Sequence, residues 1–270
     1  MRYPAVAGRF YSDSGGSLRK EVERCFLHPL GPGEIPAVIR GERSIVGAVV
    51  PHASLAASGW VAAYVYHALA RDGFPEAFII IGPNHQGFGS AISLTSQDFH
   101  TPLGAAKVDK DLVRKLTRWI EDEPFSHQYE HSIEVQLPFI QYLSPGTPFV
   151  PILMSLQDYE TAIELGRAIS EAIHGRDVVV IASSDFSHYI PAKEAREKDG
   201  AVIERVLDLD TKGVYETVMR KDVSTCGYGP VIAMLEAVHG SRAELLRYGN
   251  SGEVFSSTEV VGYGAIVVRR

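Results

Sequence analysis

The sequence predicts a single-domain α/β protein over residues 1–270, a layered α/β/α sandwich around a central, mainly parallel or mixed sheet. Five continuous apolar runs have the length of strands that are buried on both faces: 45–50, 77–81, 149–153, 178–181 and 263–268. Segments with helical spacing of apolar residues lie between these runs, and such alternation is typical of layered α/β folds. No internal repeat or long linker divides the chain, and 270 residues are near the upper size of one core.

The helices follow from apolar residues that recur every three or four positions. Over 18–26, for example, this spacing places Leu18, Val22 and Phe26 on one face. The same criterion predicts helices at 18–26, 60–69, 112–120, 133–143, 162–173, 201–207 and 231–238. Two shorter apolar segments, 91–95 and 244–248, are candidates for additional strands, antiparallel or at an edge of the sheet.

Composition excludes several classes of function. The chain has 33 acidic and 26 basic residues, a net charge of −7, and no run of Lys or Arg, so nucleic acid and anionic membranes are not expected partners. The N-terminus lacks the apolar region of a signal peptide, and no apolar run reaches the ~20 residues that a bilayer requires. We therefore expect a cytoplasmic protein, in which two cysteines do not form a disulfide framework.

Polar side chains that can carry chemistry follow three of the predicted strands directly. They are His52 after 45–50, Asn84 and His85 after 77–81, and Asp185 and His188 after 178–181. Ligands of open α/β sheets bind at the carboxyl ends of the strands, so we expect these groups to share one site. Any one of them alone is more often structural, and the joint pattern is what favours a site.

The two cysteines have different surroundings in the sequence. Cys226 lies just ahead of the predicted helix 231–238, where the positive end of a helix dipole favours a thiolate, so it is a candidate metal ligand or nucleophile. Cys25 instead falls on the apolar face of the predicted helix 18–26, which is typical of a small buried side chain.

A second pattern, His127-Gln128-Tyr129-Glu130-His131, fits the H-x-x-E-H signature of inverted zincin peptidases. That chemistry needs both histidines on one helical face. Pro124 and the late apolar periodicity predict a helix that begins near Glu130 and leaves His127 outside, which disfavours the peptidase interpretation. Glu130 and His131 then either point into the strand-end site or, in the case of Glu130, cap the helix.

Several segments together resemble the MEMO family in order and spacing. The likeness extends from residue 3 to residue 265 and is carried by Tyr3–Tyr11, Pro51–Ala53, Gly82–His85, Glu130–Glu134, Ser183–His188, Thr225–Gly227 and Val261–Ala265. It is greatest to prokaryotic members that accompany an AMMECR1-domain protein and a radical S-adenosylmethionine (radical SAM) protein, the AmmeMemoRadiSam system. Where the family commonly has Gly-Tyr after Pro-His-Ala, this chain has Ser54-Leu55, so the family's pocket shape does not carry over there.

The resemblance implies a fold shared with class III extradiol ring-cleaving dioxygenases (LigB-like) and one metal ion bound by His52, His85 and Cys226. Those enzymes hold Fe(II) with two histidines and a glutamate, whereas this chain offers a cysteine in place of the glutamate. Fe(II) or copper is therefore the expected metal, with zinc also possible, and cleavage of catechols is not expected. His188 matches the catalytic acid/base histidine of these relatives, and Asp185 is expected to act beside it.

Within the same resemblance, Asn84, Glu130 and His131 are expected to line the pocket or support the ligands. The function predicted is a metal-binding protein that is redox-related or accessory to AMMECR1-domain and radical SAM proteins. Two alternatives remain open: an extradiol-type dioxygenase with non-heme iron, and a non-catalytic module that binds a peptide or protein. A small molecule or a peptide is the expected occupant of the cleft.

Overall fold

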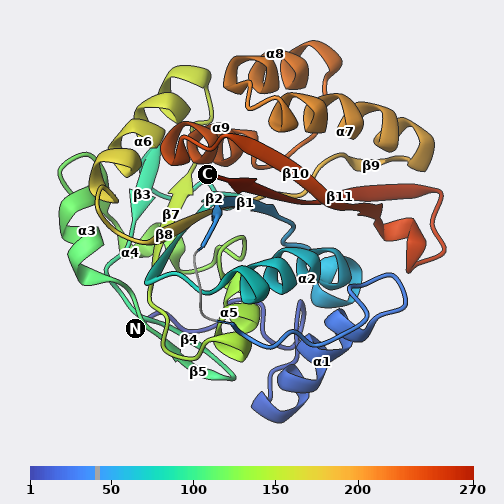
Figure 1. Ribbon diagram of the computed structural model, residues 1–270, viewed down its shortest axis with the longest axis horizontal. Coiled ribbons are helices and arrows are strands. Elements are labelled where there is room, and N and C mark those ends of the chain that lie inside the picture. Colours follow the sequence, from blue (N-terminus) through green and yellow to red (C-terminus); the bar gives the residue numbers. More distant parts are fainter. Residues whose placement is uncertain (40–42) are drawn as a thin grey trace.

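The computed structural model describes residues 1–39 and 43–270 and contains a mixed sheet built on four parallel strands. In spatial order these are β1 (Ile45–Val50), β8 (Val178–Ser183), β2 (Ala77–Pro83) and β7 (Phe149–Met154), as Figure 1 shows. Every residue of the four strands is buried. Burial on both faces explains why their sequences are continuous apolar runs rather than alternating ones.

Antiparallel strands complete both edges of the sheet. β11 (Glu259–Arg269) pairs with β1, β10 (Arg242–Asn250) pairs with β11, and the short β9 (His188–Pro191) also pairs with β11. Beyond β7 lie β3 (Ile92–Leu94) and β6 (Glu121–Asp122), while β4 (Phe99–Thr101) and β5 (Gly104–Ala106) form a separate hairpin. The predicted central sheet is confirmed, including the two tentative strands at 91–95 and 244–248.

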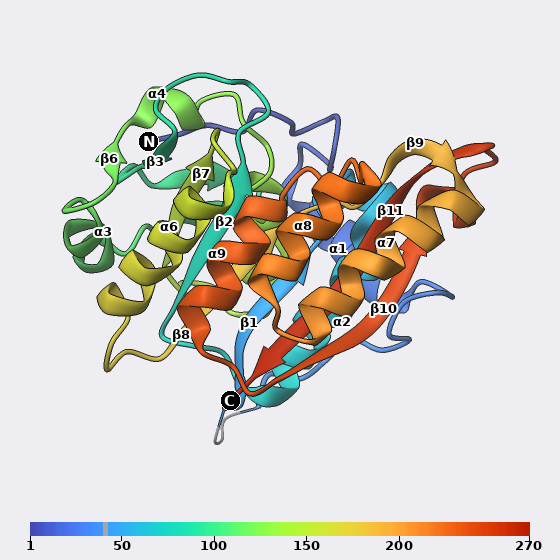
Figure 2. The same ribbon diagram turned by 90° about the horizontal axis from the view of Figure 1, so that it is seen from above.

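Helices cover both faces of this sheet, as Figures 1 and 2 show. On one face lie α6 (Tyr159–Ala172), α7 (Ala192–Leu207), α8 (Thr211–Lys221) and α9 (Tyr228–Val238), with α3 (Lys110–Leu116) beside α6. On the other lie α1 (Gly15–Leu27), α2 (Leu55–Asp72) and α5 (Leu137–Leu143). The predicted α/β/α layering is thus confirmed. Within the part of the chain that the structure describes, no helix combines the length and apolar character needed to cross a bilayer.

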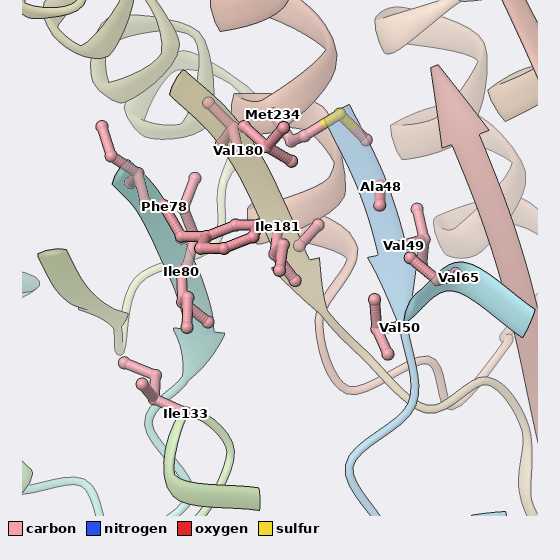
Figure 3. Close-up of a cluster of buried hydrophobic side chains, with 14 of the residues drawn as sticks. Ala48, Val49, Val50, Val65, Phe78, Ile80, Ile133, Val180, Ile181 and Met234 are labelled. Atoms are coloured by element: carbon pink, nitrogen blue, oxygen red, sulfur yellow. The ribbon is translucent and has the colours of Figure 1, made fainter. Parts of the chain in front are cut away.

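The core forms where strand side chains meet helices from both layers (Figure 3). Met234 of α9 packs against β1, and a Cβ atom at Gly47 would lie 2.5 Å from the Met234 sulfur. A glycine at this position therefore lets the helix approach the strand closely. Val65 belongs to α2, which contacts β1 from the helical layer on the other face of the sheet.

Several predicted boundaries are wrong. α2 begins at residue 55 instead of 60, α3 ends at 116 instead of 120, and α7 begins at 192 instead of 201. The first half of α7 is rich in charged residues and buries only Ala195 and Asp199, so it lacks the apolar spacing that predicts a helix. α8 was not predicted, because only Val214, Thr217 and Val218 are buried in its eleven residues.

The region around His127 also differs from its prediction. His127 lies outside the helix predicted from Glu130, as expected, but it ends a short helix that was not predicted, α4 (Pro124–His127). The segment predicted to be helical from Glu130 starts only at Glu134, as a 3-10 turn (Glu134–Gln136) ahead of α5. Glu130 and His131 lie in the irregular stretch between. No helical face carries all three residues, so the helix geometry that the inverted zincin interpretation requires is not found in this segment.

The buried ring of His127 predicts a loss of stability in acid. Burial, followed by the charge of Arg2, lowers the pKa of His127 to about 3, and its Nε2 has no hydrogen-bond partner among the described residues. The unfolded chain takes up the proton near pH 6.5 whereas the folded chain resists it, so stability present above that pH is lost as the pH falls toward 3. We expect this histidine to lower the free energy of unfolding by about 2 kcal/mol as the pH falls from about 6.5 to about 5.

Urea unfolding at a series of pH values measures this effect, with His127→Gln and, as the matched control, the exposed His174→Ala. The Gln variant should have a flatter stability profile in this range than the parent and the control. Equal slopes in all three proteins would contradict the assignment.

Candidate metal centre

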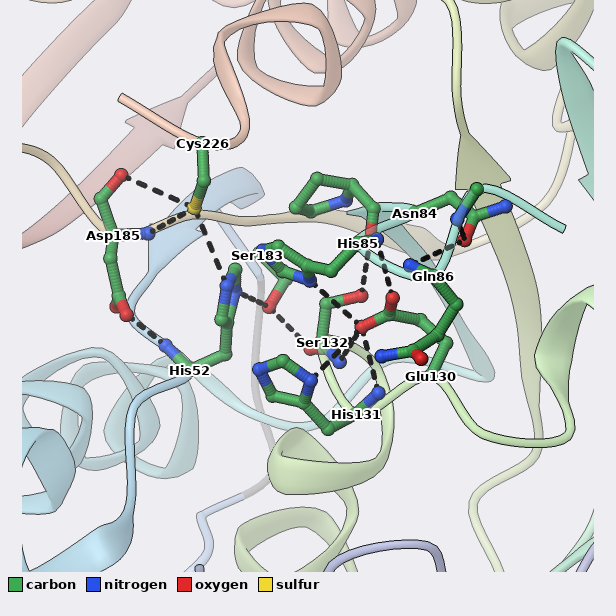
Figure 4. A network of polar contacts seen from close by, with 12 residues as sticks. His52, Asn84, His85, Gln86, Glu130, His131, Ser132, Ser183, Asp185 and Cys226 are labelled. Carbon is green, nitrogen blue, oxygen red and sulfur yellow. Dashed lines mark hydrogen bonds and ion pairs between the residues drawn. The ribbon is translucent and has the colours of Figure 1, made fainter. Parts of the chain in front are cut away.

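Three potential metal ligands converge at the carboxyl end of the parallel strands (Figure 4). His52 follows β1, His85 follows β2, and Cys226 lies in the loop that leads to α9. One donor atom from each lies within 4.8 Å of the other two, and Cys226 Sγ is 3.4 Å from His52 Nε2. Because β1 and β2 both pair with β8 as parallel strands, their ends place His52 and His85 side by side. The loop before α9 brings Cys226 to the same place, although it is 174 positions from His52 in sequence. The three ligands implied by the family resemblance are therefore neighbours in the fold.

The loop that carries Cys226 is fixed by hydrogen bonds to the neighbouring strand ends. The Asp185 backbone N–H donates to Cys226 Sγ over 3.3 Å, and the Cys226 N–H donates to the Asp185 carbonyl, also over 3.3 Å. From beyond β7, the side chain of Gln157 donates to the Cys226 carbonyl and accepts from the Gly229 N–H, both over 2.9 Å. Gln157 was missed in the sequence, although it follows a predicted strand as the ligands do.

Burial sets the protonation states of the ligands. It raises the pKa of the Cys226 thiol far above its usual value, with a further contribution from Asp185, so the prediction of a thiolate favoured by the helix start is wrong for the metal-free chain. Cys226 precedes the Gly227 N-cap, and desolvation outweighs the helix dipole. Burial and then His85 lower the pKa of His52, which keeps its ring neutral, as metal binding requires. A bound cation would displace the proton of the thiol.

Asp185 supports the backbone of the site. Its buried carboxylate accepts the backbone N–H of His52 over 2.9 Å and makes no hydrogen bond to that ring. Burial raises the pKa of Asp185 to about 6, although hydrogen bonds from the backbone of His52 and Ala53 oppose the rise. The geometry thus assigns this side chain to holding the loop after β1, and the catalytic role expected from the sequence stays a prediction.

His188 lies at the start of β9, and Ser224 contacts both its backbone N–H and its imidazole ring. Its backbone N–H donates to Ser224 Oγ over 2.7 Å, and its Nδ1 lies 2.8 Å from the Ser224 carbonyl. A carbonyl only accepts, so Nδ1 carries the proton and Nε2 keeps a free lone pair. This is the form that a general base requires, and the role itself stays a prediction.

A β-bulge directs the backbone beside His188. The register between β9 and β11 shifts at this point, and Tyr189 has a φ of 55°, which is uncommon for a large side chain. The Tyr189 ring is 72% exposed and lies 6.0 Å from the His188 ring, between centroids. No pattern in the sequence indicated this strained, exposed tyrosine next to the predicted acid/base histidine.

Glu130 holds two of the histidines with one carboxylate. Its Oε1 lies 3.0 Å from His85 Nδ1 and 3.2 Å from His131 Nδ1, and it also accepts the backbone N–H of His131 and Ser132. Burial alone would raise the pKa of Glu130, but the hydrogen bond and charge of His85 and the charge of His131 lower it to about 2.

His85, Glu130 and His131 are also close enough to form a second metal cluster, and their hydrogen bonds account for their proximity. The alternative of a helix cap is wrong for Glu130, because Ile133 is the N-cap residue of the 3-10 turn and Gln136 that of α5, and no side chain caps either.

His131 lies against the ligands and is covered by the start of the chain. Its ring stacks on that of His85 at 4.8 Å between centroids, and Phe10 meets it edge-on at the same distance. With Nδ1 turned to Glu130, its Nε2 is free. We call residues 1–11 the N-terminal segment; its contact through Phe10 makes it part of the wall of the site.

Asn84 shapes the loop that presents His85. Its side chain donates to the Phe88 carbonyl and to Ser155 Oγ, and accepts the N–H groups of Gln86 and Gly87. Its amide is thus used within the turn, so its contribution to the site is to fix the path of the chain next to His85.

Comparisons with known proteins agree with this arrangement. The profile of a family described as "Memo-like protein" matches residues 2–267. A MEMO1 family protein of Methanopyrus kandleri is 46% identical over 280 residues, covering 100% of this chain and 99% of its own. One of Methanosarcina barkeri is 46% identical (99% and 100% covered), and one of Sulfurisphaera tokodaii is 42% identical (97% of each).

Among solved structures, an uncharacterized protein of Escherichia coli K12 is similar in fold. The match has a TM-score of 0.53 and 13% sequence identity, and it covers 83% of this chain and 99% of the other. At this identity the likeness shows the fold alone.

Proposed function

The chain belongs to the Memo-like protein family, and from this premise we propose that it binds one transition-metal ion through His52, His85 and Cys226. The observation that carries the proposal is the convergence of one donor atom from each residue to within 4.8 Å of the other two. The hydrogen bond from His85 Nδ1 to Glu130 further supports it, because it leaves Nε2 of that ring unprotonated and available to a cation.

The donor set supports iron, copper or zinc. Two imidazoles and a thiolate are softer than the ligand sets that hold magnesium or calcium, and three protein ligands leave a coordination position open to a small molecule. An ion of this class supplies Lewis acidity or a one-electron couple to whatever occupies that position. The chain itself supplies His131 and His188, whose Nε2 atoms make no hydrogen bond to residues 1–39 and 43–270 and can accept or hold a proton.

Substitution with Co(II) tests the proposed ligand set directly. Thiolate ligation gives an intense charge-transfer absorption in the near ultraviolet, which we expect in the parent protein at one equivalent of cobalt. The band should be absent from Cys226→Ser and retained in Cys25→Ser, since Cys25 is buried between α1 and α2. A band that persists in Cys226→Ser would refute ligation by this thiol.

We expect the Fe(II)-loaded protein not to cleave catechols, despite its resemblance to ring-cleaving dioxygenases. A thiolate donates more charge than a carboxylate and favours a lower coordination number, so it disfavours bidentate catecholate and O₂ on one ion; it is also open to oxidation. The assay is anaerobic loading followed by catechol or protocatechuate with O₂, with detection of the yellow ring-opened product.

Product at the level of the metal-free blank is the expected result. Turnover that depends on His188 would contradict it and restore the dioxygenase alternative. Turnover gained only in Cys226→Glu would support the argument from the ligand.

A further inference from the structure

The ring of His52 contacts a buried hydroxyl whose role is not evident from the pair alone. His52 Nδ1 lies 3.0 Å from Ser183 Oγ, at the end of β8. A neutral imidazole carries its proton on either nitrogen, and a hydroxyl can donate or accept, so this contact permits both tautomers. The remaining partners of the hydroxyl decide between them.

Two further contacts of the Ser183 hydroxyl occupy its proton and one of its two lone pairs. Its Oγ lies 2.6 Å from the carbonyl of Ser132, which can only accept, so the hydroxyl proton points there. Gln136 Nε2, 2.8 Å away, can only donate and fills one lone pair. The lone pair that remains faces His52 Nδ1, which must therefore be the protonated nitrogen.

The orientation of the Gln136 amide is itself determined by its surroundings. Its Nε2 lies 3.0 Å from the Pro51 carbonyl, and its Oε1 lies 2.8 Å from the hydroxyl of Tyr66. Turning the amide over would place its oxygen against the Pro51 carbonyl and leave an acceptor without a donor. The side chains of His52, Tyr66, Gln136 and Ser183 are 2%, 0%, 0% and 0% exposed, so solvent does not substitute for these partners.

We propose that Ser183 and Gln136 are positioning residues that fix His52 as the Nδ1–H tautomer before any metal arrives, so that its Nε2 lone pair faces Cys226 Sγ. We call the chain of hydrogen bonds from Tyr66 through Gln136 and Ser183 to His52 the relay. Its residues lie in α2, in the 3-10 turn, in β8 and after β1. The effect of the relay on metal affinity rests on the proposed function, whereas the assignment of the His52 tautomer does not.

The relay also makes the two imidazole ligands unequal. His85 donates its Nδ1–H to the Glu130 carboxylate, whereas His52 donates to a neutral hydroxyl. A carboxylate acceptor raises the basicity of the opposite ring nitrogen more than a hydroxyl does. His85 is therefore the stronger donor of the pair.

Nitrogen NMR of the metal-free protein labelled in its histidine rings tests the relay. At neutral pH, protonated and unprotonated ring nitrogens have well separated shifts, and the His52 signals are assigned by their loss in His52→Ala. We expect protonated Nδ1 and unprotonated Nε2 for His52 in the parent chain, a measurement that needs no substitution in the relay. A protonated Nε2 would overturn the proposal.

Ser183→Ala should convert His52 to a mixture of tautomers and weaken metal binding about 10- to 100-fold, the usual cost of losing a group that orients a ligand. Ser93→Ala is the matched control, because Ser93 is a fully buried serine in β3 whose hydroxyl, among the residues that the structure describes, is hydrogen-bonded to Ser126 Oγ alone. The control should leave the His52 signals and the affinity unchanged. An unchanged tautomer in Ser183→Ala would refute the relay.

The relay and the metal site can fail separately. If His52 carries its proton on Nδ1 but the chain binds no metal, the relay stands and the proposed function is refuted. If the chain binds metal but His52 carries its proton on Nε2, the proposed function stands and the relay is refuted.

Discussion

Replacing Cys226 with serine is expected to weaken the binding of copper, iron or zinc by more than about 100-fold, because substitutions of groups that merely orient ligands already cost 10- to 100-fold. His52→Ala and His85→Ala should have effects of the same order, since each removes one of three converging donors. The fold should survive these changes, because His52 and His85 lie in loops after strands and Cys226 lies in the loop before α9, all three outside the apolar core. Competition titration against a chromophoric chelator measures the affinity, and the metal content at saturation gives the stoichiometry.

Two substitutions outside the site serve as controls for these measurements. Cys25→Ser removes the other thiol, and His174→Ala removes an exposed imidazole; both should retain the parent affinity and one ion per chain. Circular dichroism melting of each variant separates loss of ligand from loss of fold. Full affinity in Cys226→Ser, His52→Ala and His85→Ala would place the ion elsewhere.

Glu134→Ala is expected to lower the free energy of unfolding by about 3–5 kcal/mol, the range for removing one partner of a buried ion pair. The Glu134 carboxylate is fully buried and pairs with the Arg2 guanidinium, which is also buried. It accepts the backbone N–H groups of Ala5 and Val6 as well, and the hydroxyl of Tyr11. Removing it leaves three donors of the N-terminal segment without an acceptor and the Arg2 charge without its carboxylate, although Arg2 keeps the carbonyls of His127 and Glu130 as acceptors.

Urea unfolding of the metal-free protein measures this loss. Asp208→Ala is the control, because Asp208 pairs with Arg205 at 3.1 Å on the surface, where such pairs contribute about 1 kcal/mol or less. A Glu134→Ala variant whose free energy of unfolding lies within about 1 kcal/mol of that of the parent would contradict the proposal that Glu134 holds the N-terminal segment. About 1 kcal/mol is the low end of the measured cost of an unsatisfied buried group. Arg2→Met in the Glu134→Ala background should recover part of the loss, since the unpaired charge is then absent.

Much of the sheet could be predicted because burial on both faces marks a strand in its own sequence. β1, β2, β7 and β8 were located by their apolar runs, and the rule that sites form where parallel strands end placed His52 and His85 at one edge of the sheet. The set of three ligands that includes Cys226 was implied by the family resemblance. Helix boundaries were less accurate, because the first half of α7 is charged and carries no apolar period.

The support of the site could not be predicted from local sequence. Ser183, Gln136 and Gln157 are ordinary polar residues whose partners lie at least 47 positions away, so their hydrogen bonds depend on the completed fold. The Cys226 thiolate was predicted wrongly for a similar reason. A helix start is visible in the sequence, whereas the burial that raises the pKa of the thiol is not.

The position of β1 between β8 and β11 also determines the order in which the protein can assemble during synthesis. β1 is complete at residue 50, but its two partners begin only at residues 178 and 259, so it has no strand to pair with until most of the chain has left the ribosome. Such distant pairing makes folding slow. His52 and His85 are therefore translated long before Cys226, and the full set of proposed metal ligands exists only in the last stages of folding.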